Sequence, residues 1–215
     1  ARRIGESDGV GTRGWSGLNV WHSAAARVGG LDLGFLPARG GMDIASMGKA
    51  AKAGKLDLLW LLGADEIDFE PFASSFVVYQ GHHGDAGAHH ADLVLPGAAY
   101  TEKDGIYVNT EGRVQYATRA AFPPGDARED WAIIRAVSGA VGKSIGFDTL
   151  AELREALCAD HPHFADADTI APAIWASFGG RAKLSAEPVG QAFDNFYMTC
   201  AISRASETMA ECVRA

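Results

Sequence analysis

Four histidines and two aspartates lie close together in residues 81–96, and their side chains are of the types that hold metal ions. The stretch reads GHHGDAGAHHADLVLP and contains His82, His83, Asp85, His89, His90 and Asp92. Imidazole and carboxylate groups are common zinc ligands. Adjacent histidines diverge on a regular backbone, however, whereas ligand pairs on a helix usually stand three or four residues apart. We therefore favour solvated or hydrogen-bonded histidines of a glycine-rich loop, and keep a zinc-binding module as an alternative.

Other catalytic patterns are missing or incomplete. The sequence has no G-x-S-x-G elbow and no kinase or P-loop signature. Glu102, Asp104 and Glu111 lie near a turn, but glycoside hydrolysis requires a carboxylate pair placed across a sugar-binding cleft. We interpret these three as loop acids in contact with water. Residues 9–14, GVGTRG, match the G-x-G-x-x-G pattern, yet no apolar strand precedes them, so we expect a flexible glycine turn.

Composition excludes several classes of protein. Cys158, Cys200 and Cys212 are widely spaced and form no C-x-x-C pair, so this chain alone builds no iron–sulfur or zinc framework. The net charge is −8 and no run of lysines and arginines occurs, which argues against nucleic-acid binding. No apolar stretch reaches the roughly 18 residues of a membrane span. Residues 1–14 are polar and glycine-rich, unlike a signal peptide.

Three short apolar runs are the elements that must position the histidine-rich stretch. They are LDLLWLLG (56–63), SFVVYQ (75–80) and ADLVLP (91–96). Each is about one strand long and continuously apolar, which is typical of strands covered on both faces. Helical segments alternate with them, so we predict an α/β fold, a Rossmann-like parallel sheet flanked by helices on both faces. The histidines would then lie at the carboxyl edge of the sheet, where such folds bind ligands.

Helices and one hairpin account for most of the remaining chain. Helices are predicted for residues 15–28, 42–55, 126–142 and 148–160, and a hairpin for residues 105–117. Asp43 and Asp126 are the expected N-caps of the second and third helices, and Gly54 and Gly142 lie near the ends of these helices.

The chain changes character after Asp160, where proline, glycine and alanine recur without steady periodicity. We therefore predict a flexible lead-in (1–14), an α/β domain (15–160) and an irregular or helical C-terminal extension (161–215). The last helix of this extension is expected from about residue 203 to residue 213. Such a segment has few ways to bury itself alone, so we expect it to wrap over a partner surface.

Two long stretches carry a resemblance to a known family. Residues 81–115, GHHGDAGAHHADLVLPGAAYTEKDGIYVNTEGRVQ, and residues 123–138, PPGDAREDWAIIRAVS, resemble the large iron–sulfur subunit (the 75 kDa type) of respiratory complex I, the proton-pumping NADH:quinone oxidoreductase. Residues 196–215, FYMTCAISRASETMAECVRA, resemble the C-terminal end of that subunit. That family is itself similar to molybdopterin oxidoreductases, such as formate dehydrogenases and nitrate reductases, which share the pattern ADLVLP…E…G…N.EGR.Q.

The resemblance implies a scaffold within an electron-transfer enzyme. In the complex I branch this domain is regarded as having lost its pterin, so no catalytic, cofactor-binding or metal-binding residue is expected here. The 2Fe–2S and 4Fe–4S clusters would lie in a cysteine-rich N-terminal part of the full-length subunit. Implied partners are other peripheral-arm subunits, with no nucleic acid and no direct membrane insertion, at the cytoplasmic face of the bacterial inner membrane or the mitochondrial matrix side. Asn109, Glu111 and Arg113 would be structural, with Arg113 and Glu111 linking the hairpin to neighbouring segments.

The loop after the first strand departs from the pterin-binding pattern. Pterin-binding relatives often follow this strand with a Gly-x-Asn-Pro turn. In LLGADEIDFE, Gly63 remains, but Asp65 and Glu66 stand where the Asn and Pro would be. With Asp68 and Glu70 they form an acidic cluster that would repel an anionic pyrophosphate. The alternative, a molybdenum or tungsten pterin oxidoreductase of formate-dehydrogenase type, would also need a Cys, selenocysteine or Ser metal ligand, which we do not identify.

Overall fold

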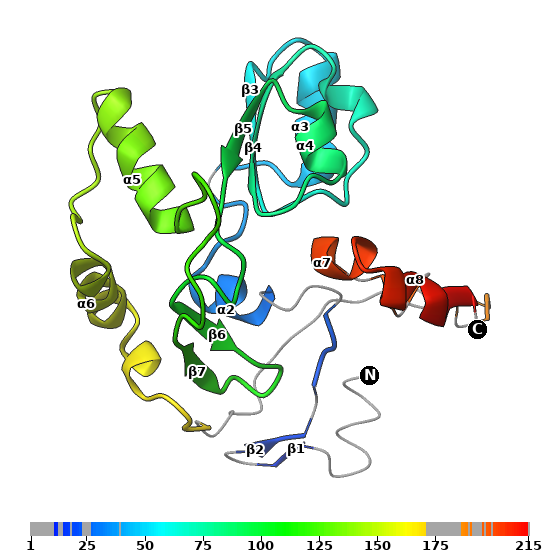
Figure 1. Cartoon of the computed structure of the whole chain (residues 1–215). Helices are drawn as coiled ribbons and strands as arrows, with labels where there is room; N and C mark the ends of the chain where they lie inside the picture. Colours follow the sequence, from blue (N-terminus) through cyan, green and yellow to red (C-terminus); the bar gives the residue numbers. More distant parts are fainter. Residues whose placement is uncertain are drawn as a thin grey trace.

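The computed structural model describes most of the chain. The described residues are 11–12, 15–17, 19–22, 27–38, 40–170, 186–188, 190, 195, 197–198 and 200–214. The strands and helices of the central part are arranged around a small parallel sheet, with a separate hairpin unit beside it (Figure 1).

The three apolar runs form the predicted parallel sheet. Its strands are β3 (Leu58–Leu62), β4 (Phe76–Gly81) and β5 (Leu93–Pro96), in the order β3-β4-β5. Leu58 pairs with Phe76, and Val78 with Leu93, so β4 lies in the centre. The expected α/β class with a parallel sheet is therefore confirmed.

One face of this sheet is covered by α3 (Ile44–Lys52), the 3-10 turn η1 (Glu70–Phe72) and α4 (Ala86–His90) (Figure 1). The buried side chains of this core are Ala51, Leu59, Leu61, Phe72, Val77 and Tyr79. Those of the strands come from alternate positions because successive strand side chains point to opposite faces.

The start and end of α3 follow the sequence. The side chain of Asp43 accepts a hydrogen bond from the Ser46 backbone N–H at 2.8 Å, which is the expected N-cap. Gly54 has a φ of 65°, a left-handed conformation that ends the helix at little cost. Both predictions are confirmed.

A second unit is built on the predicted hairpin of β6 (Gly105–Val108) and β7 (Val114–Ala117). Its core joins Val108 and Val114 to Phe164 of the 3-10 turn η2 (Pro162–Ala165), with α6 (Leu150–Asp160) packed alongside. Helix α6 begins at the capping box of Thr149 and Glu152. Phe164, which lies beyond the predicted domain boundary at residue 160, thus packs against the hairpin. The boundary itself stays a prediction.

Helix α5 (Asp130–Ala140) begins later than predicted, and Asp126 is not its cap. The backbone of Arg128 pairs with Gly97 in a parallel bridge, and the Arg128 N–H bonds to Pro96 O at 3.1 Å. Because this residue extends the pairing of the sheet, the helix begins only after Glu129, whose side chain makes no capping bond to the helix backbone. Gly142, with a φ of 72°, follows the helix end as predicted.

The predicted helix over residues 15–28 is wrong at the described residues 15–17 and 19–22, and only Arg27 and Val28 are helical. Strand β1 (Gly11–Thr12) pairs antiparallel with β2 (Trp15–Ser16), and α2 spans Arg27–Asp32. The GVGTRG stretch lies mostly outside the described residues; its central Gly11–Thr12 pair forms strand β1.

The C-terminal extension ends in two short helices where one was predicted. These are α7 (Ala201–Arg204) and α8 (Glu207–Arg214), with Ala205 and Ser206 between them. In the described part of the chain, no helix is both long and apolar enough to cross a membrane.

Candidate functional site

The carboxyl edge of the parallel sheet gathers acidic side chains from two loops. After β3, Gly63 adopts a φ of 59° and donates its N–H to Gln80 O at 2.8 Å, which turns the chain across the end of β4. Asp65 and Glu66 follow this turn; we call them the inner acids. After β4, Asp85 caps α4 by accepting the Ala86 N–H at 2.8 Å. In parallel α/β sheets this edge is the usual place for ligands.

A single arginine of the C-terminal extension binds all three carboxylates. Arg204, the last residue of α7, donates Nη2 to Asp65 Oδ2 at 2.7 Å, Nη1 to Glu66 Oε1 at 2.6 Å and Nε to Asp85 Oδ2 at 2.7 Å. The guanidinium group suits this task because its donors form a rigid planar fork. The extension is thereby tied to the sheet across 119 to 139 residues of sequence.

The arginine and its partners differ in burial. The Asp65 side chain is 8% exposed and the Arg204 side chain 26%, whereas Glu66 is 62% exposed. Asp65 is therefore the most buried partner, and water screens its pair with Arg204 less than the pair with Glu66.

The pKa values at this edge are shifted in opposite directions. Burial raises the pKa of Asp65, while the hydrogen bond from Arg204 holds the pKa of Asp85 below its ordinary value. Burial opposes the charged form of Arg204, but the hydrogen bonds to Asp85, Asp65 and Glu66 outweigh it and raise the pKa of Arg204. Arg204 thus favours the ionised form of both acids, and in Asp65 burial opposes this effect.

Close packing of α4 on β4 brings Asp85 next to Asp65. Gly87 of α4 lies on the ring of Tyr79, which is 2% exposed, and a Cβ at Gly87 would lie 2.6 Å from the ring atom Cδ2. The same Cβ would lie 3.3 Å from the Cβ of Asp65. Any side chain at Gly87 would therefore push the helix and its cap away from the inner acids.

The histidine-rich stretch divides into two separate pairs. His82 and His83 follow β4, with their Nδ1 atoms 2.6 Å apart, and burial together with the nearby His83 lowers the pKa of His82. His89 and His90 lie in α4, where His90 Nδ1 is 2.9 Å from Ala86 O. The His90 ring also stacks on Phe69 at 4.3 Å. His82 and His83 therefore lie in a turn, whereas His89 and His90 belong to a helix. The part of the chain that is described holds no group of three or more His, Cys, Asp or Glu side chains that could hold a metal ion.

The other acids of the sequence make local structural bonds. Glu102 accepts the Ala99 N–H at 3.0 Å, and Asp104 accepts the Arg119 N–H at 2.7 Å. Glu102 thus stabilises a local turn, whereas Asp104 links two segments that lie 15 residues apart in the sequence.

The hairpin turn also behaves structurally. Asn109 Oδ1 accepts the N–H groups of Glu111 and Arg113 at 3.0 and 2.9 Å. Arg113 Nη1 donates to Asp168 O at 2.9 Å, so Arg113 links the hairpin to the chain beyond η2, as expected.

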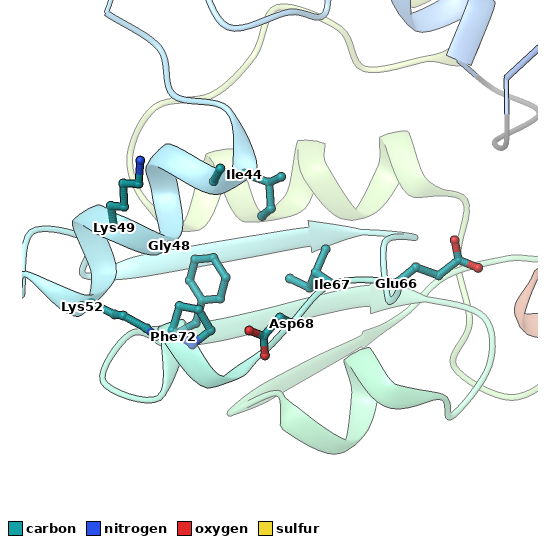
Figure 2. Close-up of a pocket in the computed structure, with 10 residues that line it drawn as sticks. Ile44, Gly48, Lys49, Lys52, Glu66, Ile67, Asp68 and Phe72 are labelled. Atoms are coloured by element: carbon teal, nitrogen blue, oxygen red, sulfur yellow. The ribbon is translucent and has the colours of Figure 1, made fainter. Parts of the chain in front are cut away.

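A pocket of about 450 Å³ lies on the other side of the same acidic loop, between α3 and η1 (Figure 2). Asp68 and Glu70, the outer acids, lie on this side: Asp68 accepts the Glu70 N–H at 3.1 Å, and Glu70 pairs with Lys52 at 3.3 Å. Lys49 points away from the Phe72 ring in Figure 2, and Glu66 points away from the other labelled side chains. Glu66 and Asp68 both line this pocket, so the predicted acidic cluster is divided by its ionic partners: Arg204 binds Asp65 and Glu66, and Lys52 binds Glu70.

Arg204 is the site residue that sequence reasoning did not identify. It stands in SRASE, a short polar stretch without a motif, and its partners lie far away in the sequence. The excess of acids in residues 65–70 was the available signal, because acids this close to a sheet edge require a cation or water.

Two family models and many known proteins match this chain. A family model described as molybdopterin oxidoreductase matches residues 6–140, and one described as the C-terminal part of the G subunit of NADH-ubiquinone oxidoreductase matches residues 169–212. The G subunit of NADH-quinone oxidoreductase from Rickettsia felis is 45% identical over 201 residues, which are 94% of this chain and 28% of that protein.

Two further relatives match a similar share of this chain. The 75 kDa subunit of NADH-ubiquinone oxidoreductase from Reclinomonas americana is 41% identical over 94% of this chain and 29% of its own length. The 78 kDa mitochondrial subunit from Candida albicans is 44% identical over 93% of this chain and 28% of its own length. The chain thus spans under a third of the length of these relatives. Among solved structures, acetylene hydratase from Pelobacter acetylenicus matches 46% of this chain and 16% of its own, with a TM-score of 0.38 and 20% identity.

Proposed function

Because the chain belongs to the molybdopterin oxidoreductase family and is similar to the Rickettsia felis relative along 94% of its length, we propose that it is the C-terminal part of the large iron–sulfur subunit of a proton-pumping NADH:quinone oxidoreductase. In this role it is a scaffold. It packs against the cluster-bearing part of the same polypeptide and against other peripheral-arm subunits, and so holds the clusters at the spacing needed for electron transfer from NADH to quinone. It works on the cytoplasmic or matrix side of the inner membrane.

One observation supports a scaffold over a redox centre: the ligand edge of the sheet holds the chain's own C-terminal extension. Arg204 binds Asp65, Glu66 and Asp85 there, all within 2.7 Å. Three carboxylates and one guanidinium leave this edge negatively charged, since the guanidinium supplies a single positive charge.

A pterin dinucleotide does not fit these residues. Its pyrophosphate is anionic and would meet the carboxylates of Asp65 and Glu66 in a partly buried edge, where like charges repel strongly. To bind there it would also have to displace Arg204, which would leave Asp65 buried without its partner. We therefore assign no cofactor to this segment, and assign the 2Fe–2S and 4Fe–4S clusters to the remainder of the full-length subunit.

The assembly role is tested in the full-length subunit within its complex. Removal of residues 193–215, or substitution Arg204→Glu, should reduce the yield of assembled complex and its NADH:quinone reductase activity in parallel. The midpoint potentials of the clusters, measured by redox titration, should stay unchanged in the complex that still assembles. Normal assembly with normal quinone reductase activity in both variants would refute the assigned role of the extension.

The assignment of no pterin is tested separately by metal and pterin analysis of the same purified complex. We expect molybdenum and tungsten far below one atom per subunit and no pterin fluorescence after oxidation. Stoichiometric metal together with a pterin would instead favour a pterin-dependent enzyme of the molybdopterin oxidoreductase family, whose model matches residues 6–140.

A further inference from the structure

The face of the parallel sheet opposite α3 and α4, here called the open face, is apolar and uncovered over much of its area. The side chains that point to it are Leu58, Trp60, Leu62, Phe76, Val78, Gln80, Leu93 and Leu95. Paired residues of neighbouring strands point to the same face, which assigns these eight together. None of the eight is charged.

Exposure divides the open face into a buried centre and an exposed rim. Val78 is 3% exposed, but Leu58 is 51%, Leu62 50%, Phe76 49% and Leu93 44% exposed. On the covered face Leu59 and Leu61 of β3 and Val77 of β4 are 6%, 4% and 4% exposed, whereas Val94 of the edge strand β5 is 46% exposed. All-parallel sheets occur almost exclusively with both faces covered, because both rows of strand side chains are apolar.

Helix α5 meets this face at the carboxyl end of β4. Gln80, which is fully buried, donates Nε2 to Asp130 O at 3.2 Å and to Asp130 Oδ1 at 3.0 Å, and Lys103 pairs with the same carboxylate. The Gln80 Oε1 atom is buried and finds no hydrogen-bond donor among the described residues. An acceptor in this state costs about 1–3 kcal/mol unless a donor reaches it.

The sheet has two unpaired edges in the described part of the chain. In the described residues β3 pairs with β4 alone, and β5 is hydrogen-bonded as a strand to β4 alone. The relatives are much longer than this chain: the 201 matched residues are 28% of the Rickettsia felis protein. A full-length protein of that kind has ample chain with which to cover the open face.

We propose that the open face binds a segment of the same full-length subunit, from the part that lies outside the present sequence. The segment presents an apolar, uncharged surface to Leu58, Leu62, Phe76 and Leu93. This inference rests on the proposed identity as part of a longer subunit. It adds that the α/β unit is completed within one polypeptide and not by a second one.

Site-specific photo-cross-linking in the assembled complex tests the proposal. Benzoylphenylalanine is placed at position 58 or 76 of the full-length subunit, and cross-linked peptides are identified by mass spectrometry. The matched control carries the same group at Phe35, which is 86% exposed and follows α2, outside the sheet. We expect positions 58 and 76 to cross-link to peptides of the same polypeptide outside this sequence, and position 35 to yield no such cross-link.

Other outcomes overturn the proposal. Cross-links from positions 58 and 76 to a different polypeptide of the complex, to a second copy of this one or to residues within the present sequence would each contradict it. Absence of cross-links at both positions in an assembled complex would do so too. The assembly assay of the Arg204→Glu variant tests the scaffold function separately. An assembly defect in that variant would support the scaffold function even where the cross-linking result contradicts the proposal for the open face.

Discussion

The inner and outer acids lie within one loop of six residues, yet the structure treats them differently. Asp65 and Glu66 turn towards the carboxyl edge and bind Arg204, and Asp65 is 8% exposed on its side chain. Asp68 and Glu70 face the α3 side, where Glu70 is 78% exposed and pairs with Lys52, 56% exposed. The difference shows that local charge density does not reveal function: the same residue types anchor a distant segment on one side and meet water on the other.

The largest effect is expected at Arg204. Arg204→Ala removes three ion pairs and leaves Asp65 buried without a cation, so the free energy of unfolding should fall by about 2–4 kcal/mol. Urea denaturation of the two proteins measures this change. Arg204→Lys keeps the charge but cannot reach three carboxylates in one plane, and should recover less than half of the loss. Equal stability of Arg204→Ala and wild type would remove the distinction between inner and outer acids.

A change at Gly87 should break the inner site without touching a charge. In Gly87→Ala the new methyl group meets the Tyr79 ring at 2.6 Å, and relief of this clash should cost about 1–3 kcal/mol. Gly84→Ala is the control because a Cβ there meets no atom within 4 Å. Thermal unfolding compares the variants, and an equal melting temperature for both would contradict the close packing of α4 described above.

Acid should release the C-terminal extension from the inner acids. Since the pKa of Asp85 is lowered from about 3.8 in the fold, its contribution to stability is complete above that value and is lost as the pH falls through the lower folded pKa. The raised pKa of Asp65 acts in the opposite sense, because its burial penalty disappears once it is protonated. The net result is a loss of the Arg204 bonds in acid.

Proteolysis of the extension as a function of pH follows this release. Cleavage within residues 200–214 should rise as the pH falls below about 3.8 in the wild type. It should already be high at neutral pH in Arg204→Ala, with little further rise. A wild-type cleavage rate independent of pH over this range would exclude carboxylates as the anchor of the extension.

The smallest effect is expected among the outer acids. Lys52→Ala removes an exposed ion pair with Glu70, and such pairs contribute about 0–1 kcal/mol. Urea denaturation should therefore show a change within about 0.5 kcal/mol of zero, and less still at high salt. A loss as large as that of Arg204→Ala would mean that both halves of the loop are structurally equivalent.

Local patterns in the sequence predicted much of the fold. Continuous apolar runs indicated β3, β4 and β5, Asp43 marked the start of α3, and the turn residue Asn109 marked the hairpin. These signals work because strand burial, capping and turns depend on residues a few positions apart. The resemblance to the large iron–sulfur subunit of complex I was likewise carried by contiguous stretches, and the comparisons confirm it.

The failures have two physical causes: weak local helix propensity, and contacts between residues that lie far apart in the sequence. Helical spacing of apolar residues in 15–28 did not form the predicted helix there, where Ser16, Gly17 and Asn19 are weak helix formers. Asp126 lost its capping role because Arg128 pairs with Gly97 of the sheet. Arg204 was missed because its partners lie at least 119 residues away, and no local pattern encodes that distance.

The coupling free energy between Arg204 and Asp65 tests most directly whether this edge anchors the extension. A double-mutant cycle of Arg204→Ala and Asp65→Asn, with amide hydrogen exchange in residues 200–214 as the readout, isolates this pair from other effects of each change. We predict a coupling of about 1–3 kcal/mol, with the double variant little worse protected than either single one. Additive losses, with a coupling indistinguishable from zero, would contradict the anchoring of the extension by this pair.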